Sequence, residues 1–444
     1  MAVLTDRCVF DALAEAACTA TAGPERVSLF LEAESSDFIR FNRGAVRQAT
    51  HVDQGEATLT LSTGQRRIEA TFALTGRLDD DVAALRAERT ALAAALADVP
   101  EDPYLLLPQE VTSSERHDTG DLPGADAVIA AVTAATRGLD FVGFHAGGPV
   151  VRAYADSGGQ RHWHHVESFH LEGCIYRERD QAIKQSLGGT HWDEAAFDER
   201  IATAAARLPL LALPPRVLQP GAWRTYFTPV AMAELLGTLA WGGFGTHARR
   251  TGTSSLDRLA RGAATLHPGV HLAEDTARGI APAFTADGFA KPACIPLVEG
   301  GRASGSLGSP RSARQYGVPA NAGADEEPES LRLAPGALRE ADALAALDRG
   351  LYVSNLWYLN YSDRQACRMT GMTRFACFWV EDGRMVAPMP VMRFDDSFLR
   401  MAGAGLVGLT DRAELIPESS TYRQRHLRSV TTPGALVEGW RLVL

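Results

Sequence analysis

The chain has 444 residues, which is more than one hydrophobic core usually serves, so its length predicts two domains. Apolar residues make up 45% of the sequence and charged residues 22%, which is typical of a soluble globular protein and excludes wholesale disorder. The net charge is -10 and no basic cluster with interleaved aromatic residues occurs, so we expect no nucleic-acid partner.

The sequence shows no targeting or membrane-spanning signal. The first 20 residues lack a basic region followed by an uninterrupted apolar stretch, and no run of about 18 apolar residues occurs anywhere. We therefore expect a cytoplasmic protein without a membrane partner. The six cysteines are scattered and form no CxxC pair, which predicts free thiols that are mostly buried.

Alternating apolar and polar residues dominate the first 76 positions. This period of two predicts a meandering antiparallel sheet with one solvated face. The predicted strand segments are 27–33, 38–44, 45–51, 55–62 and 66–76.

Helical spacing follows the first strands. Two Ala- and Leu-rich segments, 82–99 and 125–139, predict helices, and three further strand-like segments follow them at 141–146, 150–155 and 161–177. A sheet combined with long helices indicates the α+β class.

A proline-rich segment at 209–222 is the domain boundary that we expect, because its four prolines and weak periodicity suit a linker. The predicted domains are residues 1–215, with an antiparallel sheet and long helices, and residues 216–444, which are rich in β-strands.

Three features of the second half are predicted from local composition. The Gly-, Ser- and Pro-rich segment 300–330 favours a mobile loop, and residues 338–350 favour a short helix. The segment FACFWVEDGRMVAPM predicts a hairpin in which Asp382-Gly383 forms a type I′ turn.

The stretch TYFTPVAMAELLGTLAWGGFG, residues 225–245, predicts a buried helix with a single carboxylate. Thr228 can cap this helix, Pro229 suits its first position, and glycines end it about thirteen residues later. Glu234 is then either a buried acid poised for proton transfer or an acid at the margin that reaches a backbone or arginine partner. A hydrolytic Glu needs a metal or a second acid nearby, and the helix offers neither, so the second interpretation is favoured.

Several histidines lie together in RHWHHVESFH. On a strand, His162 and His164 point to one face while His165 and Glu167 point to the other, so one ion could meet at most two or three of these side chains. The favoured interpretation is a half-exposed strand with polar histidines on its solvent face. A metal site at His162, His164 and His165 is the alternative.

Other catalytic signatures are missing. The sequence has no G-x-x-x-x-G-K-[ST] phosphate loop and no G-x-S-x-G elbow, and no cysteine lies in a recognisable nucleophile context. We therefore assign no catalytic residue to this chain.

Four segments, taken in order, resemble the TldD/PmbA family, whose branches TldD and TldE are known as halves of a metallopeptidase complex. The segments are FIRFNRGAVRQATHVDQGEATLTLSTGQ, AYADSGGQRHWHHVESFHLEGCIYR, AEDTARGIAPAFTADGFAKPACIPLVEGGRASGSL and LDRGLYVSNLWYLNYSDRQACRMTGMTRFACFWVEDGRMVAPM. The resemblance rests on the order and spacing of these segments, and it extends over almost the whole chain.

The resemblance also bears on zinc. In the TldD branch, the helix similar to 229–241 carries H-E-x-x-x-H, whereas this chain has Thr228-Pro229 near the His-Glu position and no histidine in the helix. The family's third ligand is a cysteine close to the C-terminus, and the similar stretch here, LIPESSTYRQRHLRSVTTPGALVEGWRLV, contains none. The chain therefore resembles the TldE branch.

This resemblance implies a subunit without metal or cofactor, inactive alone, that pairs with a TldD-like zinc-binding subunit. Together they would enclose a chamber in which unfolded peptides are degraded or trimmed, for example by removing leaders from modified-peptide precursors. Glu234 would line that chamber. Two alternatives are a stand-alone peptide-binding or regulatory homodimer and an enzyme with a histidine-based metal site.

Overall fold

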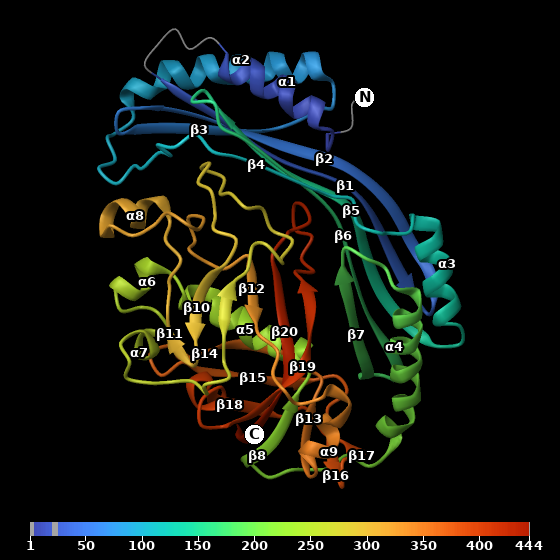
Figure 1. The fold of residues 1–444 in the computed structure, drawn as a ribbon. Helices are drawn as coiled ribbons and strands as arrows, with labels where there is room; N and C mark the ends of the chain where they lie inside the picture. Colours follow the sequence, from blue (N-terminus) through green and yellow to red (C-terminus); the bar gives the residue numbers. More distant parts are fainter. Residues whose placement is uncertain (1–3, 20–24, 444) are drawn as a thin grey trace.

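Two β-sheets, built from separate parts of the chain, form most of the protein (Figure 1). The computed structural model describes residues 4–19 and 25–443. Within these ranges, seven strands between residues 26 and 189 form the first sheet, and thirteen strands between residues 221 and 442 form the second. The predicted α+β class, with a sheet and long helices followed by a β-rich part, is confirmed. The division at residues 215 and 216 stays a prediction.

The first sheet is a curved, almost entirely antiparallel layer with the strand order β3-β2-β1-β5-β6-β4, and β7 also pairs with β6 (Figure 1). Its strands are β1 (Arg26–Asn42), β2 (Ala45–Thr63), β3 (Arg66–Ala73), β4 (Ser113–Asp118), β5 (Asp140–Asp156), β6 (Arg161–Glu178) and β7 (Gln181–Gly189). The sequence predicts β1, β2 and β5 as two short segments each, but each is one long strand.

Four helices pack along this sheet: α1 (Arg7–Cys18), α2 (Leu78–Ala95), α3 (Ala125–Ala135) and α4 (Glu194–Arg207). The sequence predicts α2 and α3 but not α1 or α4. Both missed helices have a side-chain cap, because Asp6 accepts a hydrogen bond from the Cys8 amide and Asp193 accepts one from Ala196. Leucines of α1 and α2 pack on the alternating apolar side chains of β1 and β2, which gives the first sheet its own core.

The second sheet mixes antiparallel pairs with two parallel ones, β8 with β13 and β12 with β20. Its strands are β8 (Gly221–Phe227), β9 (Leu272–Glu274), β10 (Ile295–Glu299), β11 (Arg302–Ala303), β12 (Ser330–Leu333), β13 (Gly350–Val353), β14 (Asn355–Asp363), β15 (Arg368–Arg374), β16 (Phe378–Glu381), β17 (Arg384–Pro388), β18 (Arg393–Ser397), β19 (Leu406–Pro417) and β20 (Ser429–Leu442). The predicted hairpin is confirmed as β16 and β17. Its turn residues Asp382 and Gly383 have φ angles of 49° and 70°, as a type I′ turn requires.

The β-rich part of the chain also contains short helices: α6 (Thr246–Arg250), α7 (Asp257–Ala260), α8 (Pro310–Tyr316), α9 (Ala343–Leu347) and α10 (Phe398–Met401). Within residues 300–330, where composition favours a mobile loop, the chain forms β11 and α8. The buried carboxylate of Glu326 fixes this segment, because it accepts hydrogen bonds from the amides of His247 (2.6 Å) and Ser309 (3.0 Å).

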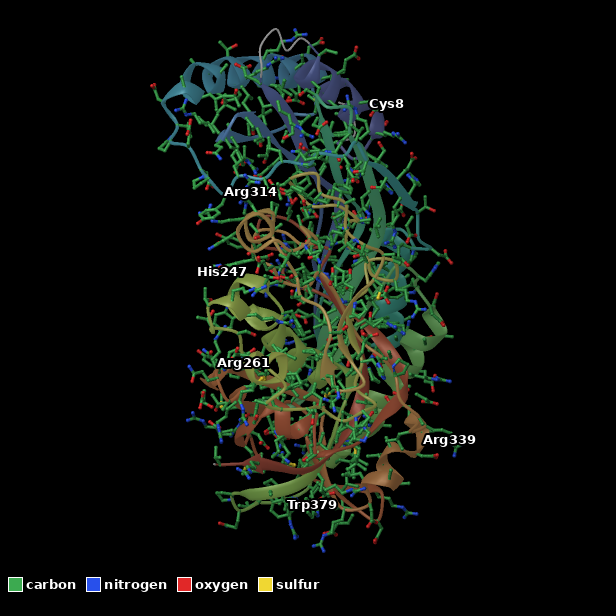
Figure 2. The ribbon with its side chains drawn as sticks, turned by 60° about the vertical axis from the view of Figure 1, so that its left-hand side comes forward. Cys8, His247, Arg261, Arg314, Arg339 and Trp379 are labelled. Atoms are coloured by element: carbon green, nitrogen blue, oxygen red, sulfur yellow. The ribbon has the colours of Figure 1, made fainter. Side chains whose placement is uncertain are left out.

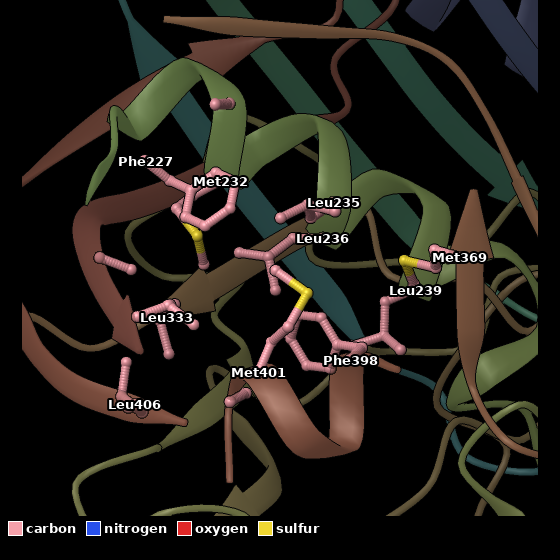
Figure 3. Close-up of a cluster of buried hydrophobic side chains, with 14 of the residues drawn as sticks. Phe227, Met232, Leu235, Leu236, Leu239, Leu333, Met369, Phe398, Met401 and Leu406 are labelled. Atoms are coloured by element: carbon pink, nitrogen blue, oxygen red, sulfur yellow. The ribbon is translucent and has the colours of Figure 1, made fainter. Parts of the chain in front are cut away.

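Helix α5 (Pro229–Gly243) matches its prediction. The Thr228 hydroxyl accepts a hydrogen bond from the Ala231 amide at 3.3 Å, Pro229 is the first helical residue, and the chain turns out of the helix at Gly242 with φ 72°. One face of α5 is fully buried in the core of the second part. Figure 3 shows this packing. The residues in contact there include Met232, Leu235, Leu236 and Leu239 of α5, with Leu333, Phe398, Met401 and Leu406.

All six cysteines are free within the described residues, but they are not mostly buried as predicted. Cys367 and Cys377 are buried, whereas Cys8 and Cys294 are exposed. Cys8 lies at the end of the molecule opposite Trp379 (Figure 2). In the described ranges, no helix combines the length and apolar character needed to cross a membrane.

Candidate functional site

A cavity of about 510 Å³ lies between the first sheet and the β-rich part. Its walls come from β6, β7 and α4 on one side, and from α5, β12, β19 and β20 on the other. This volume falls within the range of small-molecule and cofactor pockets.

One face of α5 forms a wall of this cavity. The residues that line it recur every three or four positions: Val230, Ala233, Glu234, Gly237 and Ala240. All except Glu234 are small or apolar. No heavy atom lies within 4 Å of the position that a Cβ would take at Gly237, so the cavity is open at the middle of the helix.

Glu234 is half-buried and faces the cavity. Its carboxylate accepts a hydrogen bond from the Leu356 amide at 2.5 Å. Burial raises the pKa of Glu234 to about 7, although the Leu356 amide and the Lys184 ammonium act in the opposite direction. Glu234 therefore has a backbone partner and exchanges its proton near neutral pH.

This pKa makes the stability of the fold depend on pH. Since the pKa of Glu234 is higher in the folded than in the unfolded protein, the folded state binds the proton more tightly, and stability falls as pH rises from about 4.5 to about 7. A Glu234→Gln variant loses this dependence and keeps an acceptor for Leu356. We expect it to be more stable than the wild type by about 2–3 kcal/mol at pH 8 and by less than about 1 kcal/mol at pH 5. Urea denaturation at both pH values measures this, and an equal difference at both would contradict it.

Three ion pairs also line the cavity. Lys184 contacts Glu172 at 2.9 Å, Arg200 of α4 contacts Glu414 of β19 at 3.0 Å, and Arg428 contacts Glu327 at 2.7 Å. These pairs neutralise most of the charge on the walls. Glu234 and Glu418 are the two lining acids that have no Lys, Arg or His within 4.0 Å among the residues that the structure describes.

The histidines of β6 are buried, which corrects the prediction that they lie on a solvent face. The exposed fractions are 1% for His162, 1% for His164, 8% for His165 and 5% for His170. Strand β6 is internal to its sheet, and Phe284 of the β-rich part stacks on His162 with ring centroids 4.8 Å apart. Burial lowers the pKa of His164 to about 3 and of His170 to about 4, so both are neutral at pH 7.

The structure does not bring His162, His164 and His165 together at one point. His162 shares a hydrogen bond with the Ser114 hydroxyl at 2.8 Å, and His164 makes one with the Ile280 carbonyl at 2.9 Å. His165 stacks on a histidine of β4 instead. In residues 4–19 and 25–443, no group of three or more His, Cys, Asp or Glu side chains is arranged to hold a metal ion.

Thr228 and Pro229, near the expected His-Glu position, offer no metal ligand. The Thr228 hydroxyl donates a hydrogen bond to the Ser354 carbonyl at 2.7 Å while capping α5, and Pro229 has no polar side-chain atom. The C-terminal stretch that lacks the expected cysteine contains the β19–β20 loop, residues 418–428. This loop crosses to the first sheet, where the Arg425 guanidinium donates to the Gly148 carbonyl at 2.9 Å.

A family model, the PmbA/TldA metallopeptidase C-terminal domain, matches residues 220–443. The chain belongs to the TldD/PmbA family. The family predicted from the sequence motifs is therefore confirmed. The cavity described above lies in part within the matched domain, which includes α5. No curated protein sequence matches the chain significantly.

Solved structures share the fold of this TldD/PmbA chain over nearly its full length. TldE from Thermococcus kodakarensis is 13% identical with a TM-score of 0.78, and the match covers 94% of this chain and 97% of that one. A proposed modulator of a DNA gyrase from Thermotoga maritima is 13% identical with a TM-score of 0.73, covering 94% and 96%. One from Bacteroides thetaiotaomicron is 14% identical with a TM-score of 0.72, covering 99% and 98%.

Proposed function

We propose that this chain is the non-metal, TldE-like subunit of a heteromeric zinc metallopeptidase that degrades or trims unfolded peptides in the cytoplasm. One observation carries the proposal: helix α5 lines a cavity but presents a single acid to it, with no imidazole at any position. A catalytic zinc ion needs about three protein ligands drawn from His, Cys, Asp and Glu, and α5 supplies at most one. The similarity to TldE from Thermococcus kodakarensis supports the same branch.

In this proposal the partner, a TldD-like subunit, supplies the zinc and the catalytic Glu. This chain closes the chamber and helps to hold the peptide, with Glu234 as a chamber-lining acid. Leader removal from modified-peptide precursors is one activity that such a pair would perform. The chain itself contributes no catalytic group, so it is inactive alone.

Reconstitution tests this function. The isolated chain is expected to cleave no unfolded peptide, and its mixture with a H-E-x-x-x-H-bearing homologue is expected to cleave one at least about tenfold faster than the homologue alone. Peptide fragments are quantified by mass spectrometry, with chelator-treated homologue as the zinc-free control. Unchanged cleavage when this chain is omitted would contradict the proposal.

Metal analysis separates the remaining alternatives. We expect no tightly bound zinc in the isolated chain. About one zinc per chain, lost in a His164→Ala variant, would instead favour the histidine-based enzyme. A peptide-binding homodimer that does not associate with the homologue would favour the stand-alone alternative.

A further inference from the structure

Two strands with unpaired edges border the cavity. Within the described residues, β7 pairs only with β6, and residues 413–417 of β19 pair only with β20. Residues 186–188 and 414–417 both line the cavity. A Cβ at Gly188 would lie 2.7 Å from the Pro417 ring, so the two edges approach each other there.

One of the outward backbone groups on these edges already has a partner. The Ser186 carbonyl accepts a hydrogen bond from Arg200 at 3.1 Å, and Arg200 also pairs with Glu414 across the gap between β7 and β19. Arg200 thus links the two edges to each other. The space beside α5, next to Gly237, is left open for a ligand.

The charges in the cavity favour a cationic ligand. Three lining cations are each paired with a carboxylate, whereas Glu234 and Glu418 have no cationic partner among the described side chains. Glu234 stands in a wall of α5 whose other lining residues, among them Val230 and Ala233, are small or apolar. An ammonium group on an apolar chain would complement both features, because a half-buried carboxylate gains most from a charged hydrogen-bond donor.

We propose that this cavity binds an apolar peptide segment that carries an ammonium group, with the ammonium at Glu234 and the apolar side chains against α5, in the open space next to Gly237. The ammonium comes either from the peptide's amino terminus or from a lysine side chain. The choice of a peptide rests on the proposed function, but the binding site belongs to this chain alone and needs no zinc subunit.

Peptide binding to the isolated chain tests the proposal. The probes are three fluorescent five-residue peptide amides of alternating alanine and valine: one with a free amino terminus, one acetylated, and one acetylated with lysine at its centre. Fluorescence anisotropy is expected to give at least about tenfold tighter binding for one or both ammonium-bearing peptides than for the neutral one. Comparison of the two identifies the source of the ammonium.

Variants then locate the site. Glu234→Gln is expected to remove the preference for the ammonium, whereas Glu194→Gln, an exposed position in the first turn of α4, serves as the matched control and leaves it intact. Gly237→Leu fills the open space beside α5 and is expected to weaken all three peptides about tenfold or more. Circular dichroism verifies that each variant is folded.

The failure of this inference is distinguishable from failure of the proposed function. Equal affinity for all three peptides, or an unchanged preference in Glu234→Gln, would overturn the role of Glu234. No binding to any peptide would overturn the site altogether, while activation of a zinc-bearing homologue would still support the accessory subunit.

Discussion

Replacing Arg425 with methionine is expected to lower the free energy of unfolding by about 3–5 kcal/mol. Arg425 is only 3% exposed, and its guanidinium donates hydrogen bonds to the Gly148 carbonyl at 2.9 Å and to the Ser168 carbonyl and hydroxyl at 2.5 and 2.9 Å. Burial lowers the pKa of Arg425 to about 10, and the fully buried Glu34 opposes this shift. Methionine would leave the buried Ser168 carbonyl without this donor and would remove a cation that attracts the buried Glu34 carboxylate.

Urea denaturation measures this loss, and a neighbouring arginine provides the control. Arg423 lies on the same β19–β20 loop, but its side chain is 66% exposed and pairs with Glu56 at the surface. Arg423→Met is expected to cost less than about 1 kcal/mol. Similar costs for the two variants would show that the loop does not anchor the β-rich part to the first sheet through Arg425.

The second large effect is expected at Lys291, where methionine should also cost about 3–5 kcal/mol. The Lys291 ammonium lies 3.3 Å from Glu274 and 2.5 Å from Glu329, and the side chains of Lys291 and Glu274 are each 2% exposed. Burial disfavours the charge on Lys291, but the two carboxylates outweigh it and raise its pKa. Without the ammonium, Glu274 would remain as a buried charge with no cation.

A double variant distinguishes the free-energy cost of losing the Lys291–Glu274 ion pair from the cost of leaving Glu274 as an unpaired buried charge. In Lys291→Met with Glu274→Gln, the glutamine carbonyl can still accept the hydrogen bond that Ser330 donates to Glu274 at 2.8 Å. We expect the double variant to recover at least about 1 kcal/mol relative to Lys291→Met alone. Strictly additive costs, measured by urea denaturation of all four proteins in the cycle, would contradict this.

Features that depend on neighbouring residues were predictable from the sequence. The Thr228 cap, the proline at the start of α5 and the turn at Asp382-Gly383 all follow from local backbone chemistry. The absence of histidine from α5 can be read from the sequence, but the expectation of His-Glu there came from the resemblance to the TldD branch. Local patterns also identified β1, β2, β3, β5 and β6 of the first sheet, but they missed β4 and β7 and divided β1, β2 and β5 into short segments.

Strand β1 shows why the lengths were wrong. The prediction broke this strand at the polar run Glu34–Asp37, although Glu34 and Ser36 are 0% exposed in the continuous strand. Their polar atoms bond to each other, to Gln54 and to Arg425. The sequence separation between Glu34 and Arg425 is 391 residues, so a pattern of neighbouring residues cannot predict this contact.

The site was predictable only in part, for a similar reason. Glu234 stood out as the one acid of an apolar helix, but the Arg200–Glu414 pair across the cavity joins residues 214 positions apart. The histidines of β6 were assigned to solvent because polar residues on a strand usually face water. Here Phe284 and Ile280, from the second half of the chain, contact His162 and His164.

The contact between the β19–β20 loop and the first sheet also affects folding during translation. Strand β1 leaves the ribosome early, whereas Arg425 is synthesised nearly 400 residues later, as the separation of 391 residues from Glu34 requires. Until then the buried acid in the middle of the first sheet lacks the hydrogen bond that the Arg425 amide donates to it. We therefore expect nascent chains to expose this part of the sheet to proteases and chaperones throughout translation, and to become resistant only when the last two strands have emerged.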